Sequence, residues 1–262
     1  MLIERIWSGN AYRNFHYLLA CPQTGEALAI DPFEWRLCRD TARRRGWRIT
    51  QILNTHEHHD HTGGNADLVA ATGAKVLAHT AAAARIGGVD RGLSEGETIR
   101  VGRVELVCLD TPGHTLAHLC VLWRGESPAL FCGDTLFNAG AGNCHHGGHP
   151  ERLYETFVNR LAHLPDATRV FPGHEYLVRN LQFTLDREPD NLAARELLER
   201  VRETGPADSP VTTLGEEKRI NTFFRLGSPS LLVRLRAAFP ELAARPDERT
   251  VFLKLRELRN KW

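Results

Sequence analysis

Residues 54–64 read Asn-Thr-His-Glu-His-His-Asp-His-Thr-Gly-Gly and directly follow a short apolar run that predicts a buried strand. His56, His58, Asp60 and His61 form the pattern H-x-H-x-D-H, so four side chains of metal-ligand type can converge from one compact loop. Neutral imidazole and carboxylate are ligands that Zn(II), Fe(II) and Mn(II) accept. The stretch therefore predicts a metal site at a strand end, in preference to a solvated polar loop.

Three later segments repeat the arrangement of an apolar run followed by glycine and one ligand-type residue. They end in Pro112-Gly113-His114, Gly133-Asp134 and Pro172-Gly173-His174. Glycine lets the backbone turn tightly, and sites in α/β sheets form at strand ends. Seven ligands in four loops exceed one tetrahedral ion. They suit two ions about 3.5–4 Å apart, bridged by a carboxylate.

Composition and charge narrow the class of protein. The 262 residues suffice for one large domain or a domain with an appendix, and the 42% hydrophobic and 25% charged residues are ordinary for a globular protein. A net charge of +1 predicts neither a nucleic-acid nor a membrane partner. No C-x-x-C pair, secretory pattern or membrane-length apolar run is found. A cytoplasmic protein with reduced cysteines is expected.

The order of the expected elements predicts an α/β domain at residues 1–172 and a small helical domain at residues 173–262. Many of the expected strands are continuous apolar runs, which is typical of strands buried on both faces. These strands are Tyr17–Ala20, Ala27–Ile30, Ile49–Leu53, Lys75–Ala78, Val104–Leu109, Leu119–Trp123, Ala129–Cys132 and Thr168–Phe171. Helices are expected at Leu37–Arg45, Gly64–Thr72, Ala193–Glu203, Ser230–Phe239 and Thr250–Leu258.

These motifs resemble those of the metallo-β-lactamase superfamily. The similar segments are T-H-E-H-H-D-H at 55–61, P-G-H-T at 112–115, G-D-T-L-F at 133–137 and G-H-E-Y at 173–176. Further segments resemble one branch, glyoxalase II or the hydroxyacylglutathione hydrolases, namely residues 173–183, 188–191, 213–217 and 256–262. The resemblance covers nearly the whole chain. It implies an αββα sandwich followed by a small C-terminal helical domain.

The resemblance also implies a role for each ligand. His56, His58 and His114 would hold the first metal, Asp60, His61 and His174 the second, and Asp134 would bridge both. Zinc is the expected ion, with iron or manganese as alternatives. The implied reaction is hydrolysis of a glutathione thioester by a metal-bound hydroxide, which Asp60 and Asp134 orient. Since a thiolate leaves readily, the reaction needs no strong general acid.

Substrate recognition is expected to differ in part from the family pattern. That pattern has a cysteine, a basic residue and an aromatic residue at the places of Ala141, Asn143 and His145, so a lysine contact to glutathione is missing. Tyr176, Arg256 and Arg259 match family positions, and guanidinium groups suit peptide carboxylates. The expected substrate contacts are therefore Asn143, His145, Tyr176, Arg256 and Arg259.

The remaining histidines are expected to have no role as ligands. His59 is expected at the surface or beside the ligands. His118, His79 and His163 are expected to be buried and hydrogen-bonded. His146 and His149 are expected in a polar loop at the rim.

Three other functions stay open beside thioester hydrolysis. A persulfide dioxygenase would use one iron, and the complete second ligand set argues against it. Hydrolysis of a lactone, β-lactam or other ester is a second alternative, against which Arg256 and Arg259 argue. The third is a metal-binding relative without turnover, although all seven ligand positions are filled.

Overall fold

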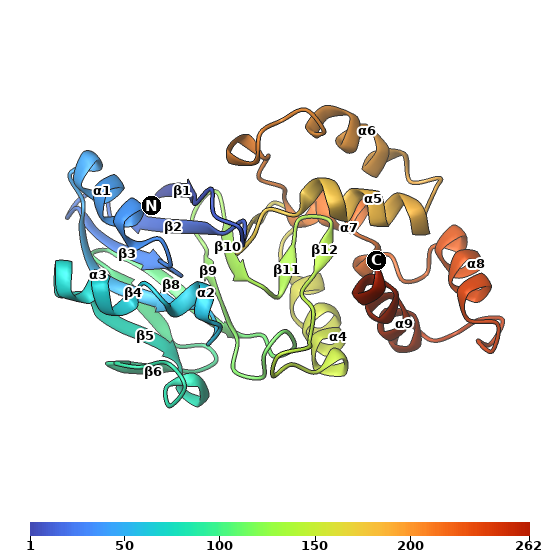
Figure 1. Cartoon of the computed structure of the whole chain (residues 1–262), viewed down its shortest axis with the longest axis horizontal. Helices are drawn as coiled ribbons and strands as arrows, with labels where there is room; N and C mark the ends of the chain where they lie inside the picture. The colour runs from blue at the N-terminus through green and yellow to red at the C-terminus, as the bar shows by residue number, and fades with distance from the viewer.

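The computed structural model describes residues 1–262, and two sheets packed face to face form its centre (Figure 1). The first has the order β1-β2-β3-β4-β5-β6 and the second the order β13-β10-β9-β8-β7. The strands of the first are β1 (Leu2–Trp7), β2 (Phe15–Ala20), β3 (Glu26–Ile30), β4 (Arg48–Asn54), β5 (Lys75–His79) and β6 (Arg91–Leu93). Those of the second are β7 (Thr98–Val101), β8 (Val104–Asp110), β9 (Leu119–Trp123), β10 (Ala129–Gly133) and β13 (Arg169–Pro172).

Nine α-helices and a small hairpin surround these sheets. The hairpin pairs β11 (Leu136–Phe137) with β12 (Gly140–Ala141). The helices are α1 (Trp35–Arg45), α2 (His59–Thr62), α3 (Asn65–Thr72), α4 (Pro150–Asn159), α5 (Leu177–Arg187), α6 (Leu192–Val201), α7 (Leu214–Ile220), α8 (Pro229–Ala238) and α9 (Glu248–Lys261).

Aromatic side chains fill the space between the two sheets. The rings of Phe131 and Phe171 stack with their centroids 4.8 Å apart, and the Tyr17 ring meets Phe131 edge-on at 5.3 Å. Every residue of β2 and β10 is buried, because each strand faces the other sheet on one side and helices on the other. This confirms the expectation that continuous apolar runs mark strands buried on both faces.

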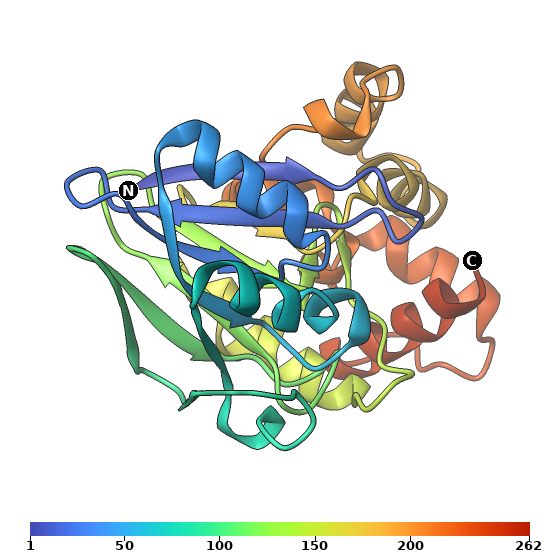
Figure 2. The ribbon, with the colours of Figure 1, turned by 60° about the vertical axis from the view of Figure 1, so that its left-hand side comes forward.

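Helices cover both outer faces, so the layers follow the order αββα. Figure 2 shows α1 and α3 across the outer face of the first sheet, where Cys38, Ala42 and Leu68 are buried against it. On the second sheet, α4 packs between the strands and the C-terminal helical part, residues 173–262 (Figure 1). The expected fold, a sandwich followed by helices, is confirmed.

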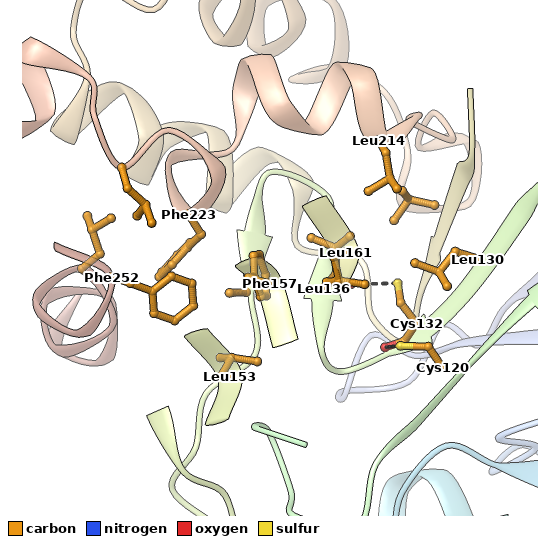
Figure 3. Packing of buried hydrophobic residues seen from close by; sticks show 14 of the residues in the cluster. Cys120, Leu130, Cys132, Leu136, Leu153, Phe157, Leu161, Leu214, Phe223 and Phe252 are labelled. Atoms are coloured by element: carbon orange, nitrogen blue, oxygen red, sulfur yellow. Dashed lines mark hydrogen bonds between the residues drawn. The ribbon is translucent and has the colours of Figure 1, made fainter. Parts of the chain in front are cut away.

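One hydrophobic cluster joins the sandwich to the C-terminal helical part. Leu153 and Phe157 of α4 lie in the same buried cluster as Phe223 and Phe252 (Figure 3). The Phe252 ring centroid lies 5.3 Å from that of Phe157 and 5.2 Å from that of Phe223. The two parts of the chain therefore share a core, and the division at residues 172 and 173 stays a prediction.

The structure contains several elements that were not predicted from the sequence, because their apolar pattern is short or interrupted. Among them are β1, β6, β7 and α4. Cys108, Cys120 and Cys132 are buried and free. The predicted burial of His163 is wrong, because it ends a short 3-10 helix after α4 and faces solvent. No helix combines the length and apolar character needed to cross a membrane.

We expect Phe252→Ala to lower the free energy of unfolding by about 3–5 kcal/mol, since it leaves a cavity in the shared cluster. Urea unfolding followed by circular dichroism measures this. Val233→Ala on α8 is the matched control, because the Val233 side chain is 69% exposed and its truncation removes no buried contact. Equal unfolding midpoints for the two variants would contradict the packing described.

Candidate metal centre and substrate cavity

The structure brings all seven predicted ligand residues together. They follow the ends of four strands, with His56, His58, Asp60 and His61 after β4, His114 after β8, Asp134 at β10 and His174 after β13. Their ligand atoms form three overlapping groups, in each of which the atoms lie within 4.8 Å of one another. These groups are His56 with His58 and His114, Asp60 with His61 and His174, and His56 with His61 and Asp134.

In the first group, main-chain carbonyls fix the protons of two histidines. His58 Nε2 donates to the carbonyl of His146 at 2.9 Å, and His114 Nδ1 donates to the carbonyl of Asn143 at 2.7 Å. The opposite nitrogens, His58 Nδ1 and His114 Nε2, therefore carry lone pairs although they lie only 3.0 Å apart. His56 Nε2 lies 3.1 Å from the same His58 nitrogen. Three nitrogens thus point at one place that a cation can occupy.

The second group is arranged in the same way. His61 Nδ1 lies 3.0 Å from Asp31 Oδ2, and His174 Nδ1 donates to the carbonyl of Tyr12 at 2.8 Å. The Nε2 atoms of the two histidines face each other at 3.2 Å, and Asp60 Oδ2 lies 3.3 Å from that of His174. The acceptors behind both rings face the Nδ1 atoms, so the Nε2 atoms are directed at the place that Asp60 Oδ2 also faces. Two imidazole nitrogens and a carboxylate oxygen are a set of ligand atoms that divalent metals accept.

Asp134 lies between the two groups. Its Oδ2 is 3.5 Å from His114 Nε2 and 3.2 Å from His174 Nε2, while its Oδ1 is 3.4 Å from His61 Nε2. Asp134 Oδ1 is buried and has no hydrogen-bond partner in the protein. A buried carboxylate oxygen without a partner is costly, and a bound cation removes this cost. The residues present therefore fit divalent metal ions.

Burial and neighbouring charges shift the pKa values of several predicted ligands. Burial lowers the pKa of His56 well below its ordinary value and that of His114 to about 4, so both are neutral ligands at pH 7. For His61, burial would lower the pKa, but Asp134 and other carboxylates outweigh it and raise it to about 9. Burial would raise the pKa of Asp134, but His174 and His61 hold it below its usual range. The carboxylates therefore favour positive charge around His61 and Asp134, while His56 and His114 stay neutral.

Gly173 shows why glycine precedes a ligand at these strand ends. A Cβ atom at this position would lie 2.4 Å from Asp134 Oδ1 and 3.0 Å from His61 Cε1. Any side chain at this position would therefore displace the Asp134 carboxylate, so only glycine fits beside the predicted ligands here.

Asp31 is a functional residue that the sequence interpretation missed. It has a left-handed backbone with φ of 49°, which is strained for a residue other than glycine. Its carboxylate accepts from the Thr55 N–H at 2.8 Å and hydroxyl at 2.7 Å, and it orients His61. The signal was present, because Asp31 follows the apolar run Ala27–Ile30 just as the predicted ligands follow theirs.

The other histidines differ in position. His118 is fully buried and accepts from the Asp134 N–H at 3.2 Å, so its predicted structural role is confirmed. His59 is exposed, with its ring against Phe33. His79 is partly buried, and its Nε2 lies 3.3 Å from Asp110. His146 and His149 are exposed, as expected for a rim loop.

A cavity of about 280 Å³ is lined by all five expected substrate contacts. The lining residues are Phe137, Ala141, Asn143, His145, Tyr176, Arg179, Asn180, Arg256, Arg259, Asn260 and Trp262. A larger cavity of about 540 Å³ shares Tyr176, Arg179 and Trp262 with it. The smaller cavity is the better candidate, because Phe137 and Asn143 line it alone, and they contact His174 and His114 respectively.

Arg259, Arg256 and Asn143 of this cavity differ in their hydrogen-bond partners. Arg259 Nη2 donates to Asn180 Oδ1 at 3.1 Å, and its guanidinium lies 5.5 Å from the centre of the Trp262 ring. Arg256 is 97% buried and donates to main-chain carbonyls. Asn143 Oδ1 accepts from the His145 N–H at 3.2 Å. Neither arginine has a carboxylate within ion-pair distance, so the cavity offers positive charge to a ligand.

Comparison with known proteins agrees with this geometry. Residues 23–174 match the metallo-beta-lactamase superfamily, and residues 175–262 match the hydroxyacylglutathione hydrolase C-terminus. A solved structure of ETHE1 from Myxococcus xanthus shares the fold, with a TM-score of 0.69, 24% identity and coverage of 93% of each chain. TTHA1623 in a di-iron-bound form has a TM-score of 0.61 and 26% identity over 85% of this chain and 100% of its own. Fold and site thus define a metallo-β-lactamase superfamily protein.

Curated relatives narrow the assignment. Proteins named hydroxyacylglutathione hydrolase from Polaromonas sp. and Nitrosococcus oceani are 64% and 62% identical to this chain, and both alignments cover 100% of each chain. The chain belongs to the hydroxyacylglutathione hydrolase family.

We expect Asp31→Asn to weaken metal binding by roughly 10–100-fold, the usual effect of changing the partner of a metal-ligating histidine. The new amide can donate to His61 Nδ1, which would place the ring proton on Nε2 and block that ligand atom. Competition with a chromophoric chelator measures the affinity. Asp40→Asn on α1 is the control, because the Asp40 side chain is 45% exposed and bonded to Arg39. Unchanged affinity in Asp31→Asn would disprove its orienting role.

Proposed function

We propose that the protein hydrolyses glutathione thioesters at a centre of two divalent cations. The observation that carries the proposal is the position of the seven ligand residues beside a cavity whose arginines lack carboxylate partners. Glutathione has two carboxylates, which guanidinium groups bind well. The relatives at 64% and 62% identity carry the name of this activity.

Two ions, in preference to one, are supported by the orientation of both ligand groups. Each group has histidine nitrogens with lone pairs directed at one point, and Asp134 reaches both groups. The related TTHA1623 is described in a di-iron-bound form. We propose zinc as the resident metal, although imidazole and carboxylate ligands also suit iron and manganese.

The chemistry divides between the ions and the protein. When bound, two divalent cations acidify water and polarise a carbonyl oxygen, which are the two needs of thioester hydrolysis. Asp60 and Asp134 are proposed to orient the attacking water. Asp31 and the Tyr12 carbonyl hold His61 and His174 in the tautomers that expose Nε2. The leaving thiolate needs no strong general acid, so no residue is proposed to protonate it.

Glutathione is proposed to lie in the cavity between the metal centre and the C-terminal helical part. Arg259 and Tyr176 line its helical side, and Asn143 and His145 line the opposite loop. Arg256 lies behind that loop as part of the same wall.

The alternatives account less well for these features. A single-iron persulfide dioxygenase would not need the oriented second group of Asp60, His61 and His174. A lactone or β-lactam hydrolase would not need the cationic cavity, and a relative without turnover would not need complete ligand sets. We also infer a small-molecule substrate without nucleic-acid or membrane partners, and a reducing cytoplasmic setting in which the six cysteines are free.

Purified without chelator, the protein should contain close to two metal ions per chain, measured by inductively coupled plasma mass spectrometry. Asp134→Ala should lose at least one ion and nearly all turnover, because the bridging carboxylate would be absent. A fully active wild-type preparation with one ion per chain would contradict the two-ion proposal.

Steady-state hydrolysis of a substrate panel tests the reaction itself. The panel contains lactoylglutathione, other acylglutathiones, coenzyme A thioesters and a lactone. The glutathione thioesters should give the highest kcat/KM. A preference for the lactone or for coenzyme A thioesters would assign the site to another substrate class.

Asn143→Lys should lower the KM for lactoylglutathione with little change in kcat, because a restored cation stabilises ground and transition states alike. A charge-assisted hydrogen bond contributes about 1.5–3 kcal/mol, while the lost bond from the His145 N–H contributes about 0.5–1.5 kcal/mol. At 1.4 kcal/mol per tenfold, a decrease of roughly tenfold in KM is expected. His149→Lys makes the same charge change outside the cavity and should leave KM unchanged. An unchanged or raised KM in Asn143→Lys would count against this loop as a glutathione contact.

A further inference from the structure

We propose that Arg256 is a positioning residue that holds two histidines of the first metal group in place through the backbone of one loop. The proposal deepens the two-cation centre proposed above. The cavity loop, residues 140–148, runs between the C-terminal helical part and the metal ligands. Arg256 contacts the loop from one side, and His58 and His114 contact it from the other.

The first link joins α9 to the loop. Arg256 Nη1 donates to the carbonyl of Ala141 at 2.8 Å and to that of Gly142 at 3.0 Å. Its Nε donates to Asn260 Oδ1 at 3.0 Å, and its guanidinium lies 5.5 Å from the centre of the Phe223 ring. The side chain is therefore fixed on several sides, and its bonds to the loop are charge-assisted.

The second link joins the loop to the metal ligands. The carbonyl of Asn143, next in the chain after Gly142, accepts from His114 Nδ1 at 2.7 Å. The carbonyl of His146 accepts from His58 Nε2 at 2.9 Å. These bonds determine which ring nitrogen of each histidine is free to bind a metal. A displacement of the loop backbone would therefore change the direction of both lone pairs.

The loop has little freedom to move without disturbing the centre. A Cβ atom at Gly142 would lie 1.9 Å from the carbonyl oxygen of Asp134, so the two backbones are in direct contact. The Gly142 N–H also donates to the Thr135 carbonyl at 3.2 Å. Arg256 is thus connected through one short stretch of backbone to His114, His58 and the loop of Asp134.

The same contacts give Arg256 a task besides any contact with the substrate. The residue is 97% buried and its Nη1 and Nε donors are occupied, although it also lines the cavity. Burial lowers its pKa to about 10, so it remains charged at neutral pH without a carboxylate partner. Arg259 lines the same cavity but differs in that it makes no hydrogen bond to the loop. The two arginines, one helical turn apart, provide matched variants.

The experiment compares metal binding and kinetics of Arg256→Ala, Arg256→Lys and Arg259→Ala in the full chain. Zinc affinity is measured by chelator competition without substrate, and the cobalt-substituted proteins are compared by their visible absorption. Both Arg256 variants should bind one of the two ions roughly tenfold more weakly, at the lower end of the effect of losing a partner of a ligating histidine. Their cobalt spectra should change and their kcat should fall. Arg259→Ala should raise KM only.

Two outcomes would overturn the proposal. One is an Arg256→Ala protein with unchanged zinc affinity, unchanged cobalt spectrum and a raised KM like that of Arg259→Ala, which would make Arg256 a substrate ligand. The other is an equal loss of zinc affinity in Arg259→Ala, which would reflect general loosening of α9. If Arg256→Ala does not fold, Arg256→Lys decides alone, since it keeps the charge but cannot reproduce the guanidinium geometry.

Failure of this proposal and failure of the proposed function give different results. The zinc and cobalt measurements need no substrate, so they hold whichever thioester or ester the protein hydrolyses. If no glutathione thioester is turned over but Arg256 variants still lose zinc affinity, only the substrate assignment is wrong. If glutathione thioesters are turned over and zinc affinity is unchanged in both Arg256 variants, only the positioning role is wrong.

Discussion

The structure depends on one constraint, which is that ring nitrogens of the predicted metal ligands are held about as close as hydrogen-bonded atoms, with acceptors on the opposite side of each ring. His58 Nδ1 and His114 Nε2 are 3.0 Å apart, and the His61 and His174 Nε2 atoms are 3.2 Å apart. Because carbonyls accept from the opposite nitrogens of His58 and His114, no proton lies between that pair when both rings are neutral. A bound cation would relieve the repulsion, and the left-handed backbone of Asp31 is a local cost of this arrangement.

The C-terminal helical part contributes to the metal centre as well as to the substrate cavity. Asn180 and Asn221 donate to the carbonyls of Asn138 and Gly140, so polar side chains from the helices hold the hairpin that precedes the cavity loop. Buried Glu217 accepts from the Ala139 N–H in the same turn, where Ala139 has a φ of 55°. Packing of the helical part therefore supports the hairpin from which the cavity loop continues.

The order of the apolar runs predicted an α/β domain followed by helices, and the resemblance to the metallo-β-lactamase superfamily implied the sandwich. The seven expected ligand residues lie together in the structure, and they could be found because ligand-type residues after apolar runs form a local pattern. The Tyr12 carbonyl was missed because a sequence does not show which main-chain carbonyl will face a ligand. Asp31 was missed although it follows an apolar run, and its contact with His61 is seen only in the structure. The burial of Arg256 was equally invisible, because on a helix wheel Arg256 and Arg259 look alike, and only packing against Phe223 and the loop distinguishes them.

A crystal structure of the zinc-loaded protein, with anomalous scattering recorded at the zinc edge, tests the central claim most directly. The account predicts two anomalous peaks. One would lie within bonding distance of His56 Nε2, His58 Nδ1 and His114 Nε2, the other within bonding distance of Asp60, His61 and His174, and Asp134 would contact both. A single peak at full zinc occupancy, or peaks bound to ring nitrogens that face the carbonyls of Asn143 and His146, would contradict it.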